Sequence, residues 1–333
     1  MTGRPPLSVG INLPTRSHPA PLTPSALMRI AETVDGVDGW SHAWVGDSIL
    51  ALPYLNSTVV LGALAARTRR VRIGVACLAS LGLRHPVTVL REWADLDFLS
   101  QGRMTMVACP GNGTGASVDA ELRVFAMRYR EKVARFEDSV RFLRHASRTP
   151  AGEALAYRSP FIAVDEMVVR PGFVQCPLPI WMVANPTPNA SAATVTRLLA
   201  RVAELGDGWM TYNITPELLA QRVGLLRRIR EDAGLSSDEP FPICVFLNGN
   251  VARTSKAAFD DAAVRWAQQG TRSITIDDLG TIGAIGSPDQ AADFIGRLWA
   301  AGATHVAIDP LSANPEDQID TLGERLLPLL DID

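Results

Sequence analysis

The sequence contains little cysteine, little lysine and no strong excess of charge of either sign. Only two of its 32 basic residues are lysines, Lys132 and Lys256, and the formal net charge is -3. Because nucleic acids and anionic membranes normally require a clustered basic excess, we expect neither as a partner. No stretch of 18 apolar residues occurs, and the first residues lack the apolar run of a signal peptide. We therefore expect a soluble protein that is not exported.

The four cysteines are spread widely along the chain, without a Cys-x-x-Cys pair and without histidines at metal-ligand spacing. A zinc site is therefore not expected, and we assign no metal-binding residues. Cys77, Cys109 and Cys244 lie in strand-like runs, which predicts buried free thiols. Free thiols are typical of reducing compartments, so this pattern favours the cytoplasm.

An apolar content of 47% with 20% charged residues is typical of a globular protein with a large core. Short runs rich in Val and Ile alternate with stretches of helical period, the pattern of repeated βα units around a parallel sheet. The predicted strands are residues 7–13, 42–47, 71–79, 103–109, 179–185, 208–213, 241–251 and 304–310. The predicted helices are residues 23–35, 57–69, 86–99, 119–146, 190–205, 216–233, 255–269, 288–301 and 315–330.

Eight strands, each followed by a helix, are what a closed (β/α)8 barrel requires. We therefore predict an α/β TIM barrel that forms a single domain over residues 1–333. Residues 147–178 alternate with period two between Gly and Pro, which predicts a hairpin inserted before the fifth strand. Residues 270–286 predict an irregular insertion before the eighth strand. A doubly wound dinucleotide-binding sheet would need Gly-x-Gly-x-x-Gly after the first strand, where the chain instead reads NLPTRSHPAPLTP.

Four stretches carry a resemblance to a known family: AWVGD, LAARTRRVRIGVACLASLGLRHP, REWADLDFLSQGR and PLPIWMVANPTPNASAATVTRLLARVAELGDGWM. In this order and spacing they resemble the bacterial luciferase-like flavin monooxygenase family. The resemblance implies a (β/α)8 barrel that binds FMN, or the deazaflavin F420, at the carboxyl ends of its strands. It also implies oxygenation of a small organic substrate by reduced FMN and oxygen, with a separate flavin reductase as partner. An F420-dependent hydride-transfer dehydrogenase or reductase, and a non-catalytic flavin-binding barrel, remain as alternatives.

Asp47 and Ser48 follow the second predicted strand and are the candidate catalytic residues. Many relatives, particularly those that use F420, carry a histidine after this aspartate as a proposed proton-transfer group. A serine hydroxyl can form hydrogen bonds but is a poor general base near neutral pH, so we do not assign that role to Ser48. The alternative is that both side chains only cap the following loop.

Two further strand ends are candidate contacts for the flavin ring. In the family the third strand ends in a bulge with a non-proline cis peptide bond, and the best match here is Cys77–Leu78, after Ala76. An ordinary strand with Cys77 in the core is the alternative. In CPGNGTG, after the fourth strand, Gly111 permits close backbone approach and Asn112 offers a donor and an acceptor. That stretch is equally compatible with a plain flexible loop.

The fifth strand ends at Asn185 and leads into a helix start that contains Asn189, Ser191 and Thr194. Free backbone N–H groups and the helix dipole favour a phosphate there. Some FMN-binding relatives use a Ser and a Thr at this spacing, whereas the longer tail of F420 needs cations, and none precedes Arg197 in this stretch. We therefore expect FMN rather than F420. Capping by Asn189 or Ser191 alone is the alternative.

Association is also expected, because relatives commonly dimerise through the helices after the second and third strands. Here these helices, TVVLGALAART and VTVLREWADLDFL, carry more apolar surface than packing on one barrel requires. We therefore predict a homodimer.

Overall fold

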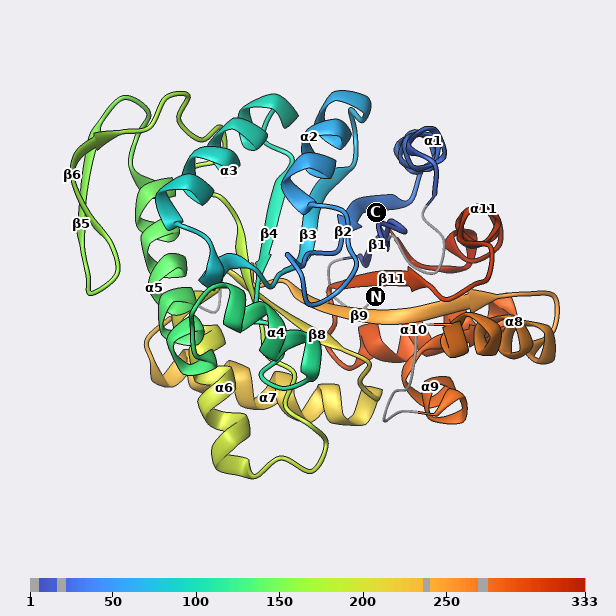
Figure 1. Ribbon diagram of the computed structural model, residues 1–333. Helices are drawn as coiled ribbons and strands as arrows, with labels where there is room; N and C mark the ends of the chain where they lie inside the picture. The colour runs from blue at the N-terminus through green and yellow to red at the C-terminus, as the bar shows by residue number, and fades with distance from the viewer. Residues whose placement is uncertain (1–5, 17–21, 236–239, 269–274, 333) are drawn as a thin grey trace. The chain divides into compact units, whose positions relative to one another are not determined.

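The computed structural model describes residues 6–16, 22–235, 240–268 and 275–332. Within these ranges, one sheet has the strand order β10-β9-β11-β1-β2-β3-β4-β7-β8, and β8 also pairs with β9. This second pairing closes eight parallel strands into a barrel, with helices between the strands (Figure 1). The predicted TIM barrel is therefore confirmed.

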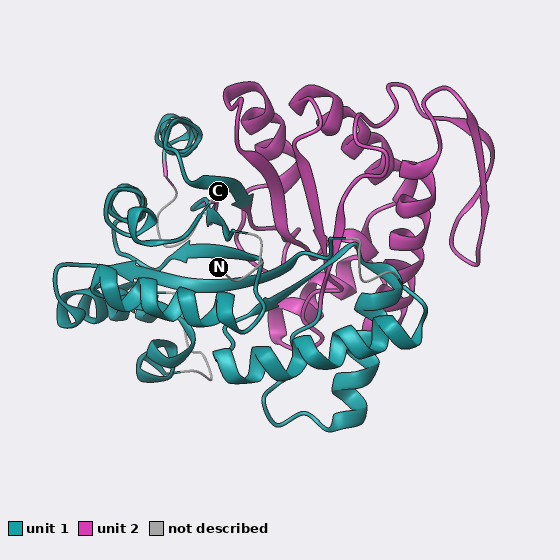
Figure 2. Cartoon of the chain, turned by 180° about the vertical axis from the view of Figure 1, so that it is seen from behind, with its two compact units in different colours: residues 1–14, 23–44, 184–333 teal, residues 15–22, 45–183 magenta. Residues whose placement is uncertain are grey.

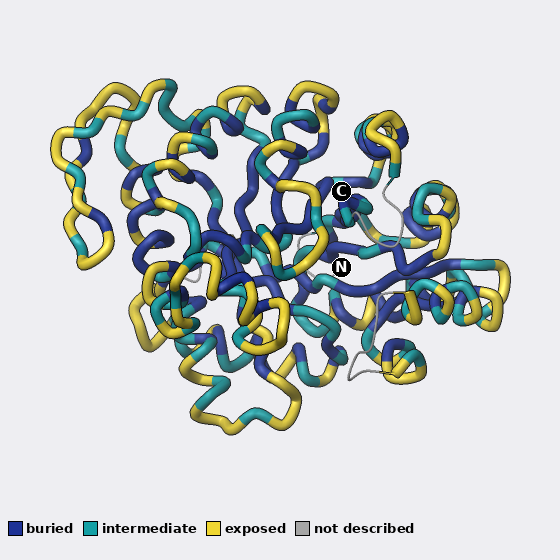
Figure 3. The backbone as a smooth tube through the Cα atoms, viewed as in Figure 1, coloured by how far each residue is buried: buried dark blue, intermediate teal, exposed yellow. Residues whose placement is uncertain are grey.

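The barrel strands coincide with the predicted runs. They are β1 (Ser8–Asn12), β2 (Trp40–Val45), β3 (Arg72–Leu78), β4 (Met104–Ala108), β7 (Ile180–Val183), β8 (Gly208–Tyr212), β9 (Ile243–Val251) and β11 (His305–Pro310). Most of their buried positions are apolar, with polar exceptions such as Asn248 and Asn250 on β9, while exposed residues concentrate on the helices and loops (Figure 3). Burial of these runs on the barrel is the main apolar contribution to the fold.

The helices between the strands begin at strong local signals. Thr23, Thr215 and Ser287 each precede a proline and accept a hydrogen bond from a backbone N–H three residues later. The helices are α1 (Pro24–Gly36), α2 (Ser57–Arg67), α3 (Pro86–Ser100), α4 (Ala116–Val124), α5 (Tyr129–Arg148), α6 (Ala192–Leu205), α7 (Pro216–Asp232), α8 (Ser255–Gln268), α10 (Pro288–Ala300) and α11 (Pro315–Arg325), with short 3-10 turns η1 (Leu81–Leu83) and η2 (Leu327–Leu329).

The predicted helix over 119–146 is wrong in one respect, because it is two helices, α4 and α5. The chain turns between them at Ala126, whose φ of 48° lies in the left-handed region that an α-helix excludes. Alanine is a strong helix former, so nothing local in the sequence marks the break. The break brings Glu121 of α4 to Lys132 of α5, which an unbroken helix would hold about 16 Å apart along its axis.

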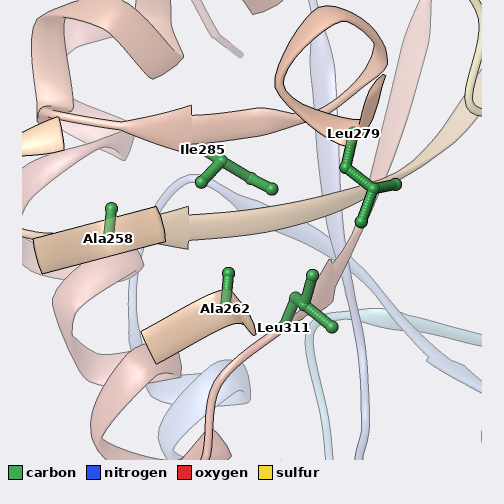
Figure 4. Close-up of a cluster of buried hydrophobic side chains, with 5 residues drawn as sticks. All are labelled: Ala258, Ala262, Leu279, Ile285 and Leu311. Atoms are coloured by element: carbon green, nitrogen blue, oxygen red, sulfur yellow. The ribbon is translucent and has the colours of Figure 1, made fainter. Parts of the chain in front are cut away.

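Both predicted insertions are present. Before β7, the strands β5 (Ala154–Arg158) and β6 (Ala163–Val168) form an antiparallel hairpin. Before β11, the chain forms α9 (Ile276–Ile282) and β10 (Ala284–Gly286), which pairs with β9. The first residues of that insertion, 270–274, lie outside the described residues. Leu279 and Ile285 anchor the rest in a buried cluster, shown in Figure 4 with its other members, Ala258, Ala262 and Leu311.

The chain divides into two compact units (Figure 2). One comprises residues 1–14, 23–44 and 184–333, and we call it the terminal unit. The other comprises residues 15–22 and 45–183, and we call it the central unit. The single domain expected from the sequence stays a prediction.

The cysteines correct one expectation. Cys77 and Cys109 are not free thiols but form a disulfide, with their Cα atoms 5.9 Å apart. They meet because β3 and β4 are parallel neighbours in which Leu78 lies opposite Ala108, a relation that a separation of 32 residues does not reveal. Cys244 is free, and burial raises the pKa of its thiol. The cytoplasm was expected because three cysteines were predicted to be free thiols, and two of these three are paired in the disulfide.

Among the described residues, no helix is both long enough and apolar enough to cross a bilayer.

The hairpin insertion is held to the central unit by Asp97, a fully buried carboxylate on α3. Its Oδ2 accepts hydrogen bonds from the backbone N–H groups of Val174 (2.7 Å) and Gln175 (2.9 Å). Its Oδ1 accepts one from Gln175 Nε2 (2.7 Å). One side chain on α3 therefore fixes the segment that returns from β6 to β7.

Replacing Asp97 with alanine leaves three donors without their acceptor, so we expect the free energy of unfolding to fall by about 3 kcal/mol. The matched control is Asp95→Ala, two residues earlier on α3, whose partner Arg91 lies in an exposed ion pair. That change should alter the free energy by no more than about 0.5 kcal/mol. Urea denaturation measures both, and equal losses in the two variants would contradict the anchoring role.

Candidate active site

Asp47 cross-links two strand ends of the central unit. It follows β2, is buried, and its Oδ1 accepts a hydrogen bond from Ser57 Oγ (2.7 Å), at the start of α2. Its Oδ2 accepts one from the backbone N–H of Ser80 (2.9 Å), just after β3. Ser48 is also buried, and its Oγ accepts from the N–H of Leu52 (2.9 Å). Both side chains therefore order the loops at this edge, and their catalytic role stays a prediction.

The non-proline cis bond lies one residue earlier than predicted, between Ala76 and Cys77 instead of Cys77–Leu78. In the ladder, Ala76 pairs with Val107 and Leu78 with Ala108, so Cys77 is the extra residue of a bulge. The small residues of VACLAS mark such a place, but they do not determine which bond it uses. Ala76 and Cys77 are half-buried, whereas Leu78 is buried in the core.

The glycine-rich stretch after β4 lies directly against α5. Gly111 has a φ of 73°, and a Cβ added there would lie 3.1 Å from Lys132 Nζ. A Cβ on Gly113 would lie 2.9 Å from the ring of Tyr129, whose hydroxyl donates to Gly111 O (3.0 Å). The backbone is therefore fixed by close packing that only glycine permits. Asn112, between the two glycines, is exposed.

A buried ion pair that the sequence analysis missed lies at the same edge. Lys132 is 3% exposed, and its Nζ lies 3.7 Å from Oε2 of Glu121. The other oxygen of Glu121 accepts hydrogen bonds from the N–H groups of Leu50 (2.8 Å) and Ala51 (3.1 Å). Burial lowers the pKa of Lys132, opposed by the charges of Glu121 and Asp47. The available signal was compositional: a chain that otherwise uses arginine places one of its two lysines here.

Several polar groups lie close together at the strand ends of the central unit. Gly111 packs against Lys132 Nζ and against Ala79, the neighbour of Ser80, so the loop after β4 lies beside the segment that follows β3. Ser80 Oγ is buried and has no hydrogen-bond partner among the described residues. Buried polar atoms normally have partners, so this hydroxyl indicates a ligand atom or a water molecule at the site.

The predicted phosphate residues lie in the terminal unit. Ser191 is the N-cap of α6, and its Oγ accepts from the N–H of Thr194 (3.3 Å) and donates to Thr194 Oγ1 (3.0 Å). Asn185 Oδ1 accepts from Thr211 Oγ1 (3.0 Å) on β8, and Asn189 is exposed. The helix start is thus open on its outer side, as a phosphate site requires.

A cation that the sequence analysis missed lies beneath the same segment. Arg222 of α7 is buried, and its Nη2 donates to the carbonyls of Pro186 (2.6 Å) and Thr187 (3.2 Å). Its Nε has no partner among the described residues, and burial lowers the pKa of the guanidinium. The stretch before Arg197 therefore does have a positive charge beside it, supplied by a helix that follows in the sequence. The contrast in charge used to favour FMN over F420 is weaker than the sequence suggested.

The predicted site residues thus belong to two groups. The central unit contains Asp47, Ser48, Ala76, Cys77, Leu78, Gly111 and Asn112, and the terminal unit contains Asn185, Asn189, Ser191 and Thr194. Those of the central unit lie in β3 and in the loops after β2 and β4, and those of the terminal unit lie in the segment before α6 and in the first turn of that helix.

Comparisons with known proteins support the resemblance. Residues 7–280 match the family model of luciferase-like monooxygenases. The chain is 29% identical to the F420-dependent glucose-6-phosphate dehydrogenase of Nakamurella multipartita, over 53% of this chain and 45% of that protein. The match therefore spans about half the length of that relative.

Two solved structures share the fold along nearly their whole length. The monooxygenase RslO1 from Streptomyces bottropensis aligns with a TM-score of 0.74 at 18% identity, covering 97% of this chain and 99% of that one. The oxygenating constituent of 3,6-diketocamphane monooxygenase from Pseudomonas putida, solved with FMN, aligns with a TM-score of 0.73 at 12% identity, covering 98% and 100%. At these identities the likeness shows the fold, and the family model carries the assignment. The chain belongs to the luciferase-like monooxygenase family.

Proposed function

We propose that the protein is a flavin-dependent oxidoreductase that oxygenates a small organic substrate with reduced FMN and oxygen. The observation that carries the proposal is the buried hydroxyl of Ser80, which has no hydrogen-bond partner among the described residues and follows Ala79, the residue against which Gly111 packs. Bound FMN would supply the electron chemistry, and the protein would orient the ring and exclude water. A separate reductase that supplies reduced FMN, and a location in the cytoplasm, belong to the same proposal.

Specific roles follow for the residues of the central unit. The backbone of Ala76, Cys77 and Gly111 would lie against the ring, and Asn112 would donate to or accept from its heteroatoms. Asp47 keeps the ends of β2 and β3 together through Ser57 and Ser80, so it would act by positioning these groups. Ser48, whose hydroxyl is engaged with Leu52, would hold its own loop.

A second candidate is hydride transfer with F420 in the absence of oxygen. Two observations favour it: the named activity of the Nakamurella relative, and the buried charge of Arg222 beneath the segment that leads to α6. An anionic tail longer than a single phosphate would gain from that charge. Titration with both cofactors distinguishes the two candidates.

A homodimer is a further part of the proposal. Val59 on α2 is 72% exposed, and Phe98 and Leu99 on α3 are 56% and 59% exposed. The two helices pack on each other within the central unit, so these side chains lie on neighbouring helices. Large apolar side chains on neighbouring helices are typical of an interface, and a second copy would cover them with the same surface.

The phosphate site can be tested without removing the cap of α6. In the double variant Ser191→Gly with Thr194→Val, glycine retains most of the capping stability. Loss of two hydroxyl donors should weaken FMN binding about tenfold or more. Binding of riboflavin, which has no phosphate, should not change. Thr196→Val, an exposed position on the same helix, is the control. Fluorescence titration measures both ligands, and unchanged FMN affinity in the double variant would contradict the site.

The proposed dimer can be tested by light scattering at micromolar protein concentration. The wild-type chain should have twice the mass of the monomer. The double variant Val59→Glu with Phe98→Glu should be monomeric, because buried unpaired carboxylates are costly. Val264→Glu, at an exposed position on α8, should remain dimeric. A monomeric wild-type chain would rule out the proposed interface.

A further inference from the structure

We propose that Lys132 is the cation that stabilises the negative charge of the reduced flavin ring. This inference rests on the proposed function and concerns a residue that family resemblance did not point to. Lys132 lies at the strand ends of the central unit, packed against Gly82 and Gly111 and beside the carboxylate of Glu121.

The backbone of Lys132 is fixed by direct packing. A Cβ on Gly82, in the turn η1, would lie 2.4 Å from the carbonyl oxygen of Lys132, so the turn and α5 are in close backbone contact. One turn earlier on α5, the hydroxyl of Tyr129 is bonded to Gly111 O. The helix start is therefore joined both to the end of β3 and to the loop after β4.

The ammonium group of Lys132 is held by a long contact with its partner carboxylate. Oε2 of Glu121 lies 3.7 Å from Nζ, which is longer than an ordinary hydrogen bond, although the charge of Glu121 still raises the pKa of the lysine. A buried ammonium with so long a contact retains much of its desolvation cost. Its Nζ also lies close to Gly111, so a group bound at this loop that accepts hydrogen bonds or carries negative charge would gain from it.

The surrounding charges are suited to respond to such a group. Glu121 on α4 and Asp47 after β2 both raise the pKa of Lys132, whereas burial lowers it. Tyr129, a titratable group in contact with this loop, donates a hydrogen bond to Gly111 O. A ligand that becomes more negative must therefore raise the pKa of Lys132, and by linkage a protonated Lys132 must favour the more negative form.

The charge of a lysine is compact, and its pKa responds to burial and to neighbouring charge, so its coupling to the ring can be measured at this residue. Two-electron reduction of bound FMN by dithionite adds two electrons and one proton and leaves one negative charge on the ring. Lys132 keeps its own proton in this step and stabilises that charge electrostatically.

The test compares midpoint potentials of bound FMN. The reference is Glu121→Gln, which keeps the cation, and the test variant is Glu121→Gln with Lys132→Met, which removes it without leaving a buried carboxylate unpaired. We expect the preference for reduced over oxidised FMN to fall at least tenfold, which is about 30 mV for a two-electron couple. In Lys132→Arg the midpoint potential of bound FMN should stay close to that of the wild-type protein. In Lys256→Met, at an exposed site on α8, it should be unchanged.

A second measurement requires no change near the site. Because the chain has two lysines, a protein labelled with 13C-lysine gives two lysine side-chain signals, and Lys256→Arg leaves that of Lys132 alone. Its pKa should be higher with reduced FMN than with oxidised FMN. In the flavin-free protein, Asp47→Asn should lower it, because Asp47 raises it.

The possible outcomes distinguish failure of the proposed role of Lys132 from failure of the proposed flavin-dependent function. If wild-type protein binds FMN but the potential and the pKa of Lys132 do not depend on each other, Lys132 serves only as the counter-charge of Glu121 and this inference is wrong. If wild-type protein binds no flavin at all, the proposed function fails and this inference fails with it. A lower potential in Glu121→Gln with Lys132→Met, together with a pKa of Lys132 that is the same with oxidised and with reduced FMN when the lysine is present, would contradict direct charge coupling.

Discussion

Two buried carboxylates hold the strand ends of the central unit in place. Asp47 joins the end of β2 to the start of α2 and to the residue after β3. Glu121 holds the loop after β2 through two backbone N–H groups and pairs with Lys132 of α5. Because each carboxylate joins segments far apart in the sequence, together they position the loops after β2 and β3 relative to α4 and α5. The glycines at 111 and 113 then bring the backbone onto α5 where a side chain would not fit.

Most of the fold could be predicted because its signals are local. Alternation of apolar runs and helical periods identified the eight strands, and the Thr–Pro and Ser–Pro pairs marked helix starts that the structure has. The hairpin before β7 followed from period-two alternation between glycines and prolines. The break at Ala126 was missed because it depends on how α4 and α5 pack and not on the residue itself.

The site was predicted less completely because its interactions are between distant residues. The disulfide between Cys77 and Cys109, the pair of Glu121 with Lys132, and the reach of Arg222 to Pro186 all cross between elements. A one-dimensional pattern carries no information about which side chains meet. The cis bond was misplaced by one residue for a related reason, since the bulge of β3 is set by its pairing with β4.

The central claim is that this barrel binds FMN and uses it for oxidation chemistry. Family membership and the unpartnered hydroxyl of Ser80 support this claim. The buried Arg222 also favours F420, so the choice between the two cofactors is the part of the claim that most needs a direct test. Fluorescence titration of the purified chain with FMN, riboflavin and F420 tests it most directly. We predict saturable binding of one FMN per chain, with weaker binding of riboflavin and of F420. Binding of F420 more tightly than FMN would overturn the cofactor, and failure to bind either would contradict the function itself.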